Sequence, residues 1–142
     1  PIEGVAGCPV KVDHSDGTSQ QAQFPALIAP WQPFRDITAL SHQAGGKLMT
    51  CQFHGDTFEM EDQRQWGDAS FKTYNRPLAK PWPYKIKPNA ALEQMVELTW
   101  QKGLPPSSTS HSLRMCYFQS WRWLSPPLMP PAWQTIRATS RW

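Results

Sequence analysis

The chain has 142 residues, enough for one domain with a hydrophobic core. Its fifteen prolines, about twice the usual share, argue against an all-helical protein. All eleven acids lie in residues 1–97 beside nine Lys or Arg, whereas residues 98–142 hold five Lys or Arg and no acid. Because no apolar run reaches about eighteen residues, the sequence predicts no membrane span. No signal peptide is recognisable at the start, so we expect a cytoplasmic protein.

Residues 8–24 are expected to form a β-hairpin. Val10 and Val12 alternate with polar residues, as they do in a strand with one buried face. The segment 15–18 supplies turn residues, and its Gly17 suits a positive φ. The return strand is polar, which favours a place at the edge of a sheet.

A Pro-rich segment, residues 24–34, follows the hairpin. Proline restricts itself and the residue before it to extended backbone, so we predict an ordered crossing loop, pinned by Trp31 and Phe34. Residues 36–40 fit either a helical turn or a short strand, and the pattern does not separate the two. His42 lies in a turn-like context and is expected to face solvent.

Further strands are expected in residues 47–54, 57–62, 69–75 and 92–100. In residues 57–62 the side chains alternate, so that Phe58 and Met60 would face a core while Thr57, Glu59 and Glu61 share the other face. The predicted fold class is therefore mainly β, a partial antiparallel β-sandwich spanning residues 1–101 with long Pro-pinned loops.

Residues 102–142 form an irregular C-terminal tail rich in Pro, Ser, Trp and Arg, where neither strand nor helix periodicity persists. One interpretation is a basic, aromatic binder of nucleic acid, since rings stack on bases and Arg meets phosphates. The favoured interpretation is a frame-shifted or disordered segment, because its local preferences agree with no fold. We therefore expect no nucleic-acid partner.

Residues 55–84 concentrate the side chains that a sugar-handling site needs. Carboxylates and cations serve proton transfer and hydroxyl binding, and flat rings pack on the apolar faces of sugars. The candidate site residues are Glu59, Asp62, Arg64, Trp66, Asp68, Lys72 and Tyr74.

The same region resembles the D-apionate lactonase family through the string MEDQRQWGDASFKTY, residues 60–74. PIEGVAG at the N terminus, SDG in the predicted turn and FPALIAPWQPFRDI at residues 24–37 resemble that family in the same order. The resemblance covers about residues 1–100. Departures occur at His54, Gln65 and Gly67, where the family pattern has other residues.

The resemblance implies an interior segment of a much longer enzyme that converts D-apionolactone to D-apionate. The segment would belong to a β-sandwich similar in style to sugar mutarotase domains, would lack the barrel domain of the parent chain and would be inactive alone. The implied ligand is a small sugar-acid lactone, and no cofactor is expected. An alternative is a non-catalytic sugar-binding β-domain that supports a separate catalytic domain.

Lactone hydrolysis needs a base that activates water, a group that stabilises an oxyanion and a proton for the leaving hydroxyl. For the base and the acid we predict Glu59 and Asp62. Arg64 or Lys72 would bind the oxyanion or the product carboxylate. Trp66 and Tyr74 would pack on the sugar, and Asp68 would bind it.

A structural interpretation stays open for the same residues. Glu59 and Glu61 could form a solvated strand face, and Asp62 with Arg64 could simply tie a loop through an ion pair. His54 and Asp56 could join the two glutamates around a metal, but Gly55 interrupts the strand, so we predict no metal site.

Overall fold

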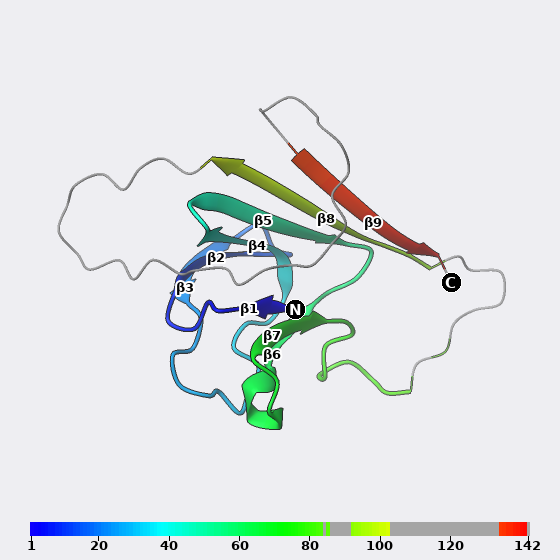
Figure 1. Cartoon of the computed structure of the whole chain (residues 1–142). Coiled ribbons are helices and arrows are strands. Elements are labelled where there is room, and N and C mark those ends of the chain that lie inside the picture. Colours follow the sequence, from blue (N-terminus) through cyan, green and yellow to red (C-terminus); the bar gives the residue numbers. More distant parts are fainter. Residues whose placement is uncertain (84, 86–91, 103–133, 142) are drawn as a thin grey trace.

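The computed structural model describes residues 1–83, 85, 92–102 and 134–141, with side chains for all of these except residues 102 and 134–141. Within this part of the chain the fold is mainly β, and its strands form two antiparallel sheets (Figure 1). The predicted fold class is confirmed.

The larger sheet has the strand order β3-β2-β4-β5-β8-β9. Its strands are β2 (Pro9–His14), β3 (Ser19–Gln23), β4 (Ile37–Ala44), β5 (Lys47–His54), β8 (Glu93–Lys102) and β9 (Gln134–Arg141). The expected hairpin is β2 and β3, joined by a turn in which Gly17 has φ +83°. The ambiguous residues 36–40 enter strand β4, which pairs with β2 and β5.

The smaller sheet has the order β1-β7-β6, formed by β1 (Ile2–Glu3), β6 (Glu59–Asp62) and β7 (Ser70–Tyr74). A 3-10 helix, η1 (Gln63–Trp66), connects β6 to β7 and was not expected from the sequence. Asp62 caps its N terminus by accepting a hydrogen bond from the Arg64 amide, and Gly67 ends it with φ +81°.

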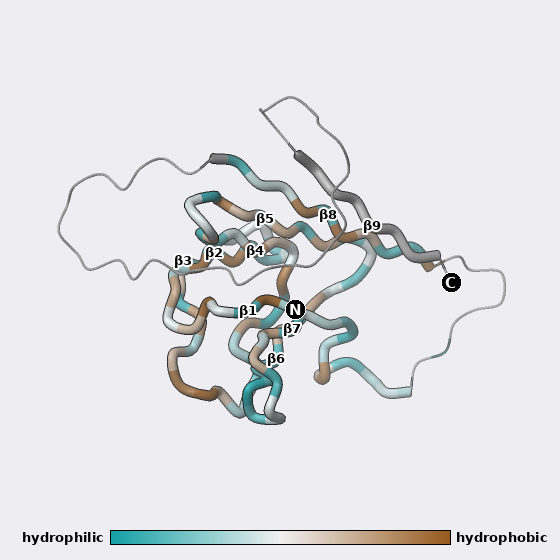
Figure 2. The backbone as a smooth tube through the Cα atoms, in the orientation of Figure 1, coloured by the Kyte–Doolittle hydropathy of each residue, from teal (hydrophilic) through white to brown (hydrophobic). Residues whose placement is uncertain are grey.

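Both sheets contribute to one core. Its buried members are Val5, Cys8, Val10, Val12, Phe24, Phe34, Ile37, Leu40, Phe53, Phe58, Met60 and Phe71. The Phe24 ring lies 5.2 Å from Phe71 of the smaller sheet and 6.0 Å from Phe34, centroid to centroid. Figure 2 shows hydrophilic and hydrophobic residues mixed along strands β2, β4, β5 and β8.

Two predictions about the core are wrong. Trp31 is 76% exposed, so it does not pin the loop that follows β3, whereas Phe34 does, being 6% exposed. His42, expected to face solvent, is instead half-buried and packs edge-on against Phe24, with ring centroids 5.6 Å apart. Leu40 and His42 share the face of β4 that meets the core. Burial there lowers the pKa of His42.

Most of the predicted tail, residues 103–133 and 142, lies outside the described residues. The nucleic-acid and frame-shift interpretations concern these residues and therefore stay predictions. Within that tail, residues 134–141 form β9, which pairs with β8 along its whole length. No helix in the described part of the chain has the length and apolar character to cross a membrane.

Candidate functional site

One face of the β6–β7 hairpin gathers four of the seven predicted site residues, Glu59, Trp66, Lys72 and Tyr74. Cross-strand pairing places Glu59 opposite Tyr74 and Glu61 opposite Lys72, so these four side chains share one face of the hairpin. Trp66 and Gln63 of η1 join them by hydrogen bonds to Glu61. We call this set, Glu59, Glu61, Gln63, Trp66, Lys72 and Tyr74, the hairpin face.

Glu59 is the buried carboxylate of the hairpin face, with 4% of its surface exposed. Its Oε2 accepts a hydrogen bond from the Tyr74 hydroxyl at 2.9 Å and another from the Leu78 amide at 3.2 Å. Burial and the bond to Glu59 raise the pKa of Tyr74 to about 12, so the phenol stays a donor at neutral pH. Glu59 is therefore not part of a solvated strand face.

Glu61 and Lys72 fix the more exposed half of the hairpin face. The Trp66 indole N–H donates to Glu61 Oε1 at 3.1 Å while 71% of the residue stays exposed. Lys72 Nζ lies 2.7 Å from Asp68 Oδ2 and donates to Gln63 Oε1 at 3.2 Å. The indole is thus held by its nitrogen, and most of its surface is available to a ligand.

Asp62 and Arg64 lie apart from the hairpin face. Asp62 follows Met60 on the core side of β6 and is fully buried. Its Oδ1 accepts from Arg64 Nε at 2.8 Å and its Oδ2 from Arg64 Nη2 at 2.7 Å. Arg64 packs over the Phe71 ring, with its guanidinium carbon 4.7 Å from the centroid.

This ion pair holds the segment between β3 and β4. Arg64 donates to the carbonyl oxygens of Pro25, Ala26 and Leu27 at 2.8 to 3.1 Å. Asp62 Oδ2 accepts from the Ala29 amide at 2.9 Å. The hydrogen bonds from Arg64 lower the pKa of Asp62, which keeps the carboxyl ionised. The geometry favours the structural interpretation of the pair, and a catalytic role for Asp62 stays a prediction.

Sequence reasoning missed Gln63 and Gln32. Gln63 lies in η1, which has no sequence signal of its own beyond the Asp62 cap. Gln32 hydrogen-bonds Tyr74 from the Pro-rich segment and also accepts from Arg35 at 3.0 Å. Only the tertiary structure brings that segment to β7, so no local pattern reveals the contact.

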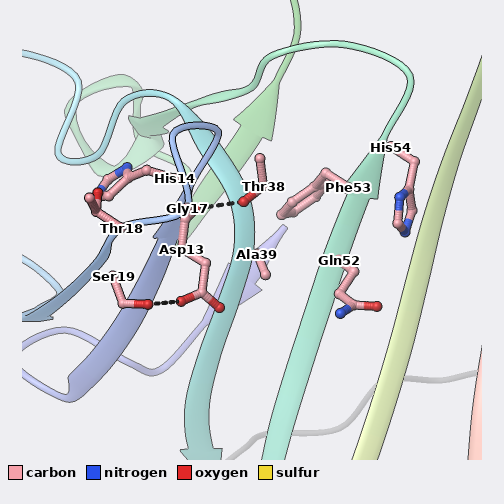
Figure 3. Close-up of a pocket in the computed structure, with 10 residues that line it drawn as sticks. All are labelled: Asp13, His14, Gly17, Thr18, Ser19, Thr38, Ala39, Gln52, Phe53 and His54. Carbon is pink, nitrogen blue, oxygen red and sulfur yellow. Dashed lines mark hydrogen bonds between the residues drawn. The ribbon is translucent and has the colours of Figure 1, made fainter.

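Away from the hairpin face, a cleft of about 420 Å³ lies on the larger sheet (Figure 3). The β2–β3 turn and the ends of β4 and β5 line it, and Asp13 accepts a hydrogen bond there from Ser19. His14 and His54 lie at the ends of β2 and β5, with β4 between these strands. None of the predicted site residues lines this cleft.

The four residues considered for a metal site do not converge. Asp56 binds Arg76 and Lys80, and Glu59 binds Tyr74 and Leu78. Among the residues with described side chains, no three His, Cys, Asp or Glu lie where they could hold a metal ion together.

Residues 1–103 match the family described as D-apionate lactonase, N-terminal domain. A curated D-apionate lactonase from Brucella anthropi is 57% identical over 99 residues, which cover 69% of this chain and 16% of that protein. No solved structure matches the chain. The chain therefore spans about a sixth of that relative's length, and it belongs to the D-apionate lactonase N-terminal domain family.

Proposed function

We propose that the chain is part of a carbohydrate-lactone hydrolase that opens D-apionolactone to D-apionate, and that the hairpin face contributes contacts to the sugar. The observation that carries the proposal is the exposed Trp66 indole, fixed by Glu61 beside Lys72, in a chain of the lactonase family. The indole would pack on the apolar side of the ring, and the polar side chains around it would bind hydroxyl groups.

Glu59 is the best-placed base on the hairpin face. Its Oε2 is occupied by Tyr74 and Leu78, whereas no hydrogen bond to its Oε1 is found among the described residues. In the proposed reaction Oε1 takes a proton from water as the water oxygen bonds to the lactone carbonyl carbon. The ring C–O bond then breaks, and the alkoxide oxygen receives a proton to become the leaving hydroxyl.

The groups that would donate the proton and bind the oxyanion are less well placed in this chain than the base. Asp62, predicted as the acid, has both oxygens engaged by Arg64 and Ala29. We propose that groups from the rest of the lactonase, such as its barrel domain, complete the site and that the chain alone does not hydrolyse the lactone.

A second candidate is a non-catalytic sugar-binding β-domain that supports the active site of another domain. The separation of Asp62 and Arg64 from the hairpin face favours it, because only binding groups and one buried carboxylate remain there.

Turnover in the intact lactonase separates the two candidates. Glu59→Gln, which keeps the shape but removes the base, should lower kcat by at least about a hundredfold if Glu59 is the base. Asp62→Asn should lower activity only as far as it lowers the folded fraction. Unchanged kcat in Glu59→Gln would leave the non-catalytic binding domain as the better account.

A further inference from the structure

Gln32, in the Pro-rich segment, connects Arg35 to the phenol of Tyr74. Its Oε1 accepts a hydrogen bond from Arg35 Nη2 at 3.0 Å, and its side chain also hydrogen-bonds Tyr74. Because an arginine side chain only donates hydrogen bonds, the contact with Arg35 fixes which end of the amide is the oxygen. The hydrogens on Gln32 Nε2 are then the groups that can face the phenol.

The Tyr74 hydroxyl has one hydrogen, and this hydrogen lies on the side of Glu59. The hydroxyl donates to Glu59 Oε2 over 2.9 Å, so the phenol oxygen can only accept the bond from Gln32 Nε2. Burial and the bond to Glu59 raise the pKa of Tyr74, whereas Gln32 lowers it, as a donor to the phenol oxygen does. The hydrogen bonds therefore run in one direction, from Arg35 through Gln32 and Tyr74 to the carboxylate.

Backbone hydrogen bonds on either side of the buried carboxylate fix the segment that carries Gln32. The Met60 amide donates to the carbonyl oxygen of Phe34, two residues after Gln32, at 2.9 Å. The Ile37 amide donates to the Phe58 carbonyl oxygen at the same distance. The place of the Gln32 amide is thus set by bonds to the first part of β6 and to the residue before that strand.

The hydrogen bonds that reach Glu59 make its two oxygens unequal. Oε2 accepts from the Tyr74 hydroxyl at 2.9 Å and from the Leu78 amide at 3.2 Å. Oε1 has no hydrogen bond to any residue that the structure describes. Two fixed donors on Oε2 restrict rotation of the carboxylate, and Oε1 keeps its lone pairs for a water molecule.

We propose that Gln32 is a positioning residue for the base. It holds the Tyr74 hydroxyl as a donor to Glu59 Oε2, which leaves Oε1 as the oxygen that takes the proton from water. The inference rests on the proposed function, in which Glu59 is that base. An acceptor in place of the amide donor would disturb this arrangement, because the one Tyr74 hydrogen serves one acceptor at a time.

Two substitutions of Gln32 in the intact lactonase test the direction of these bonds. Gln32→Glu keeps the size of the side chain and an acceptor for Arg35, but it replaces the amide donor with an oxygen that competes for the Tyr74 hydrogen. Gln32→Met removes the donor without adding an acceptor. With rates divided by the folded fraction, Gln32→Glu should lower kcat about tenfold and Gln32→Met about threefold, both with KM unchanged. Gln21→Met, at an exposed glutamine of edge strand β3, is the control and should change neither constant.

Combination with Glu59→Gln shows whether Gln32 acts through the base. Once Glu59→Gln has removed the base, adding Gln32→Glu should lower kcat no further, because the hydrogen bonds have no base left to position. A purely structural role of Gln32 predicts losses that multiply, and no larger loss for the carboxylate of equal size than for methionine.

The outcomes separate this inference from the proposed function. A larger loss for Gln32→Glu than for Gln32→Met, absent in the Glu59→Gln background, would support the positioning role. A fall in kcat for Glu59→Gln, with no losses, equal losses or the reverse order in the two Gln32 variants, or with losses that multiply, would overturn that role and leave Glu59 as the base. Unchanged kcat in Glu59→Gln would overturn both.

Discussion

Tyr74 lies directly across the β6–β7 ladder from Glu59 and donates its hydroxyl hydrogen to Glu59 Oε2 over 2.9 Å. The bond connects the two sides of the hairpin face, an aromatic side chain on β7 and the buried carboxylate on β6. Gln32 reaches Tyr74 from the Pro-rich segment, so three parts of the chain meet at this phenol. The position of the Glu59 carboxylate therefore depends on Tyr74.

Replacing Tyr74 with Phe should lower the free energy of unfolding by about 1 kcal/mol at neutral pH, because it removes one hydrogen bond to a buried carboxylate. The folded pKa of about 12 exceeds the ordinary value of 10.0, so the contribution of Tyr74 is complete below pH 10 and is lost as the pH rises through 12. Urea unfolding of both proteins at neutral pH and at about pH 11 measures this. A difference that does not shrink at the higher pH would contradict the assignment.

Asp62→Asn should lower the free energy of unfolding by about 3 kcal/mol, since it leaves Arg64 without its charge partner beside the core. Asp68→Asn removes the same charge from a solvent-exposed pair of equal length with Lys72 and should cost much less. Chemical unfolding compares the two variants. Equal losses would show that the Asp62–Arg64 pair does not hold the segment after β3.

The stability that the Asp62–Arg64 pair provides should depend on pH. Because the folded pKa of Asp62 is lowered below its ordinary value of 3.8, its contribution is present above pH 3.8 and is lost as the pH falls through the folded pKa. The stability gap between the unmodified chain and Asp62→Asn should therefore narrow in acid, as followed by urea unfolding from neutral pH downward. A constant gap would mean that Asp62 does not titrate as the structure requires.

Gly55→Ala should be among the most destabilising single changes at a glycine. A Cβ on Gly55 would lie 2.1 Å from the Glu93 carbonyl oxygen, and φ is +93°. We expect a loss of at least about 2 kcal/mol, from steric overlap and from left-handed backbone strain together. Gly46→Ala is the control, because it has φ +71° but open space around its Cβ, and it should show the strain alone. Thermal unfolding that ranks the two variants equally would contradict the close approach of β5 and β8.

Strong alternation made much of the β-structure predictable. Residues 47–54 form β5 with the predicted bounds, and Phe58 and Met60 are buried as expected. Residues 36–40 stayed ambiguous because a short run fits a helical turn and a strand equally well. Only pairing with β2 and β5 decides between them.

The arrangement of the candidate site was predictable only in part. Period-two geometry indicated that Glu59 and Glu61 share a face, and the structure places Lys72 and Tyr74 beside them. The Asp62–Arg64 pair holds residues more than thirty positions away in the chain, a contact with no local signature. The exposure of Trp31 was not predicted for the same reason. We expected the Trp31 indole to fix the segment after β3, whereas the Asp62–Arg64 pair holds that segment.

If the hairpin face binds a sugar through Trp66, the indole N–H resonance of that residue should respond to the ligand. We expect this NMR signal, identified by its loss in Trp66→Ala, to shift saturably as D-apionate is added to the chain. Trp66→Ala should weaken binding about tenfold, whereas Trp82→Ala, which removes another exposed indole, should leave it unchanged. A Trp66 signal that stays fixed while D-apionate saturates the chain would contradict the claim.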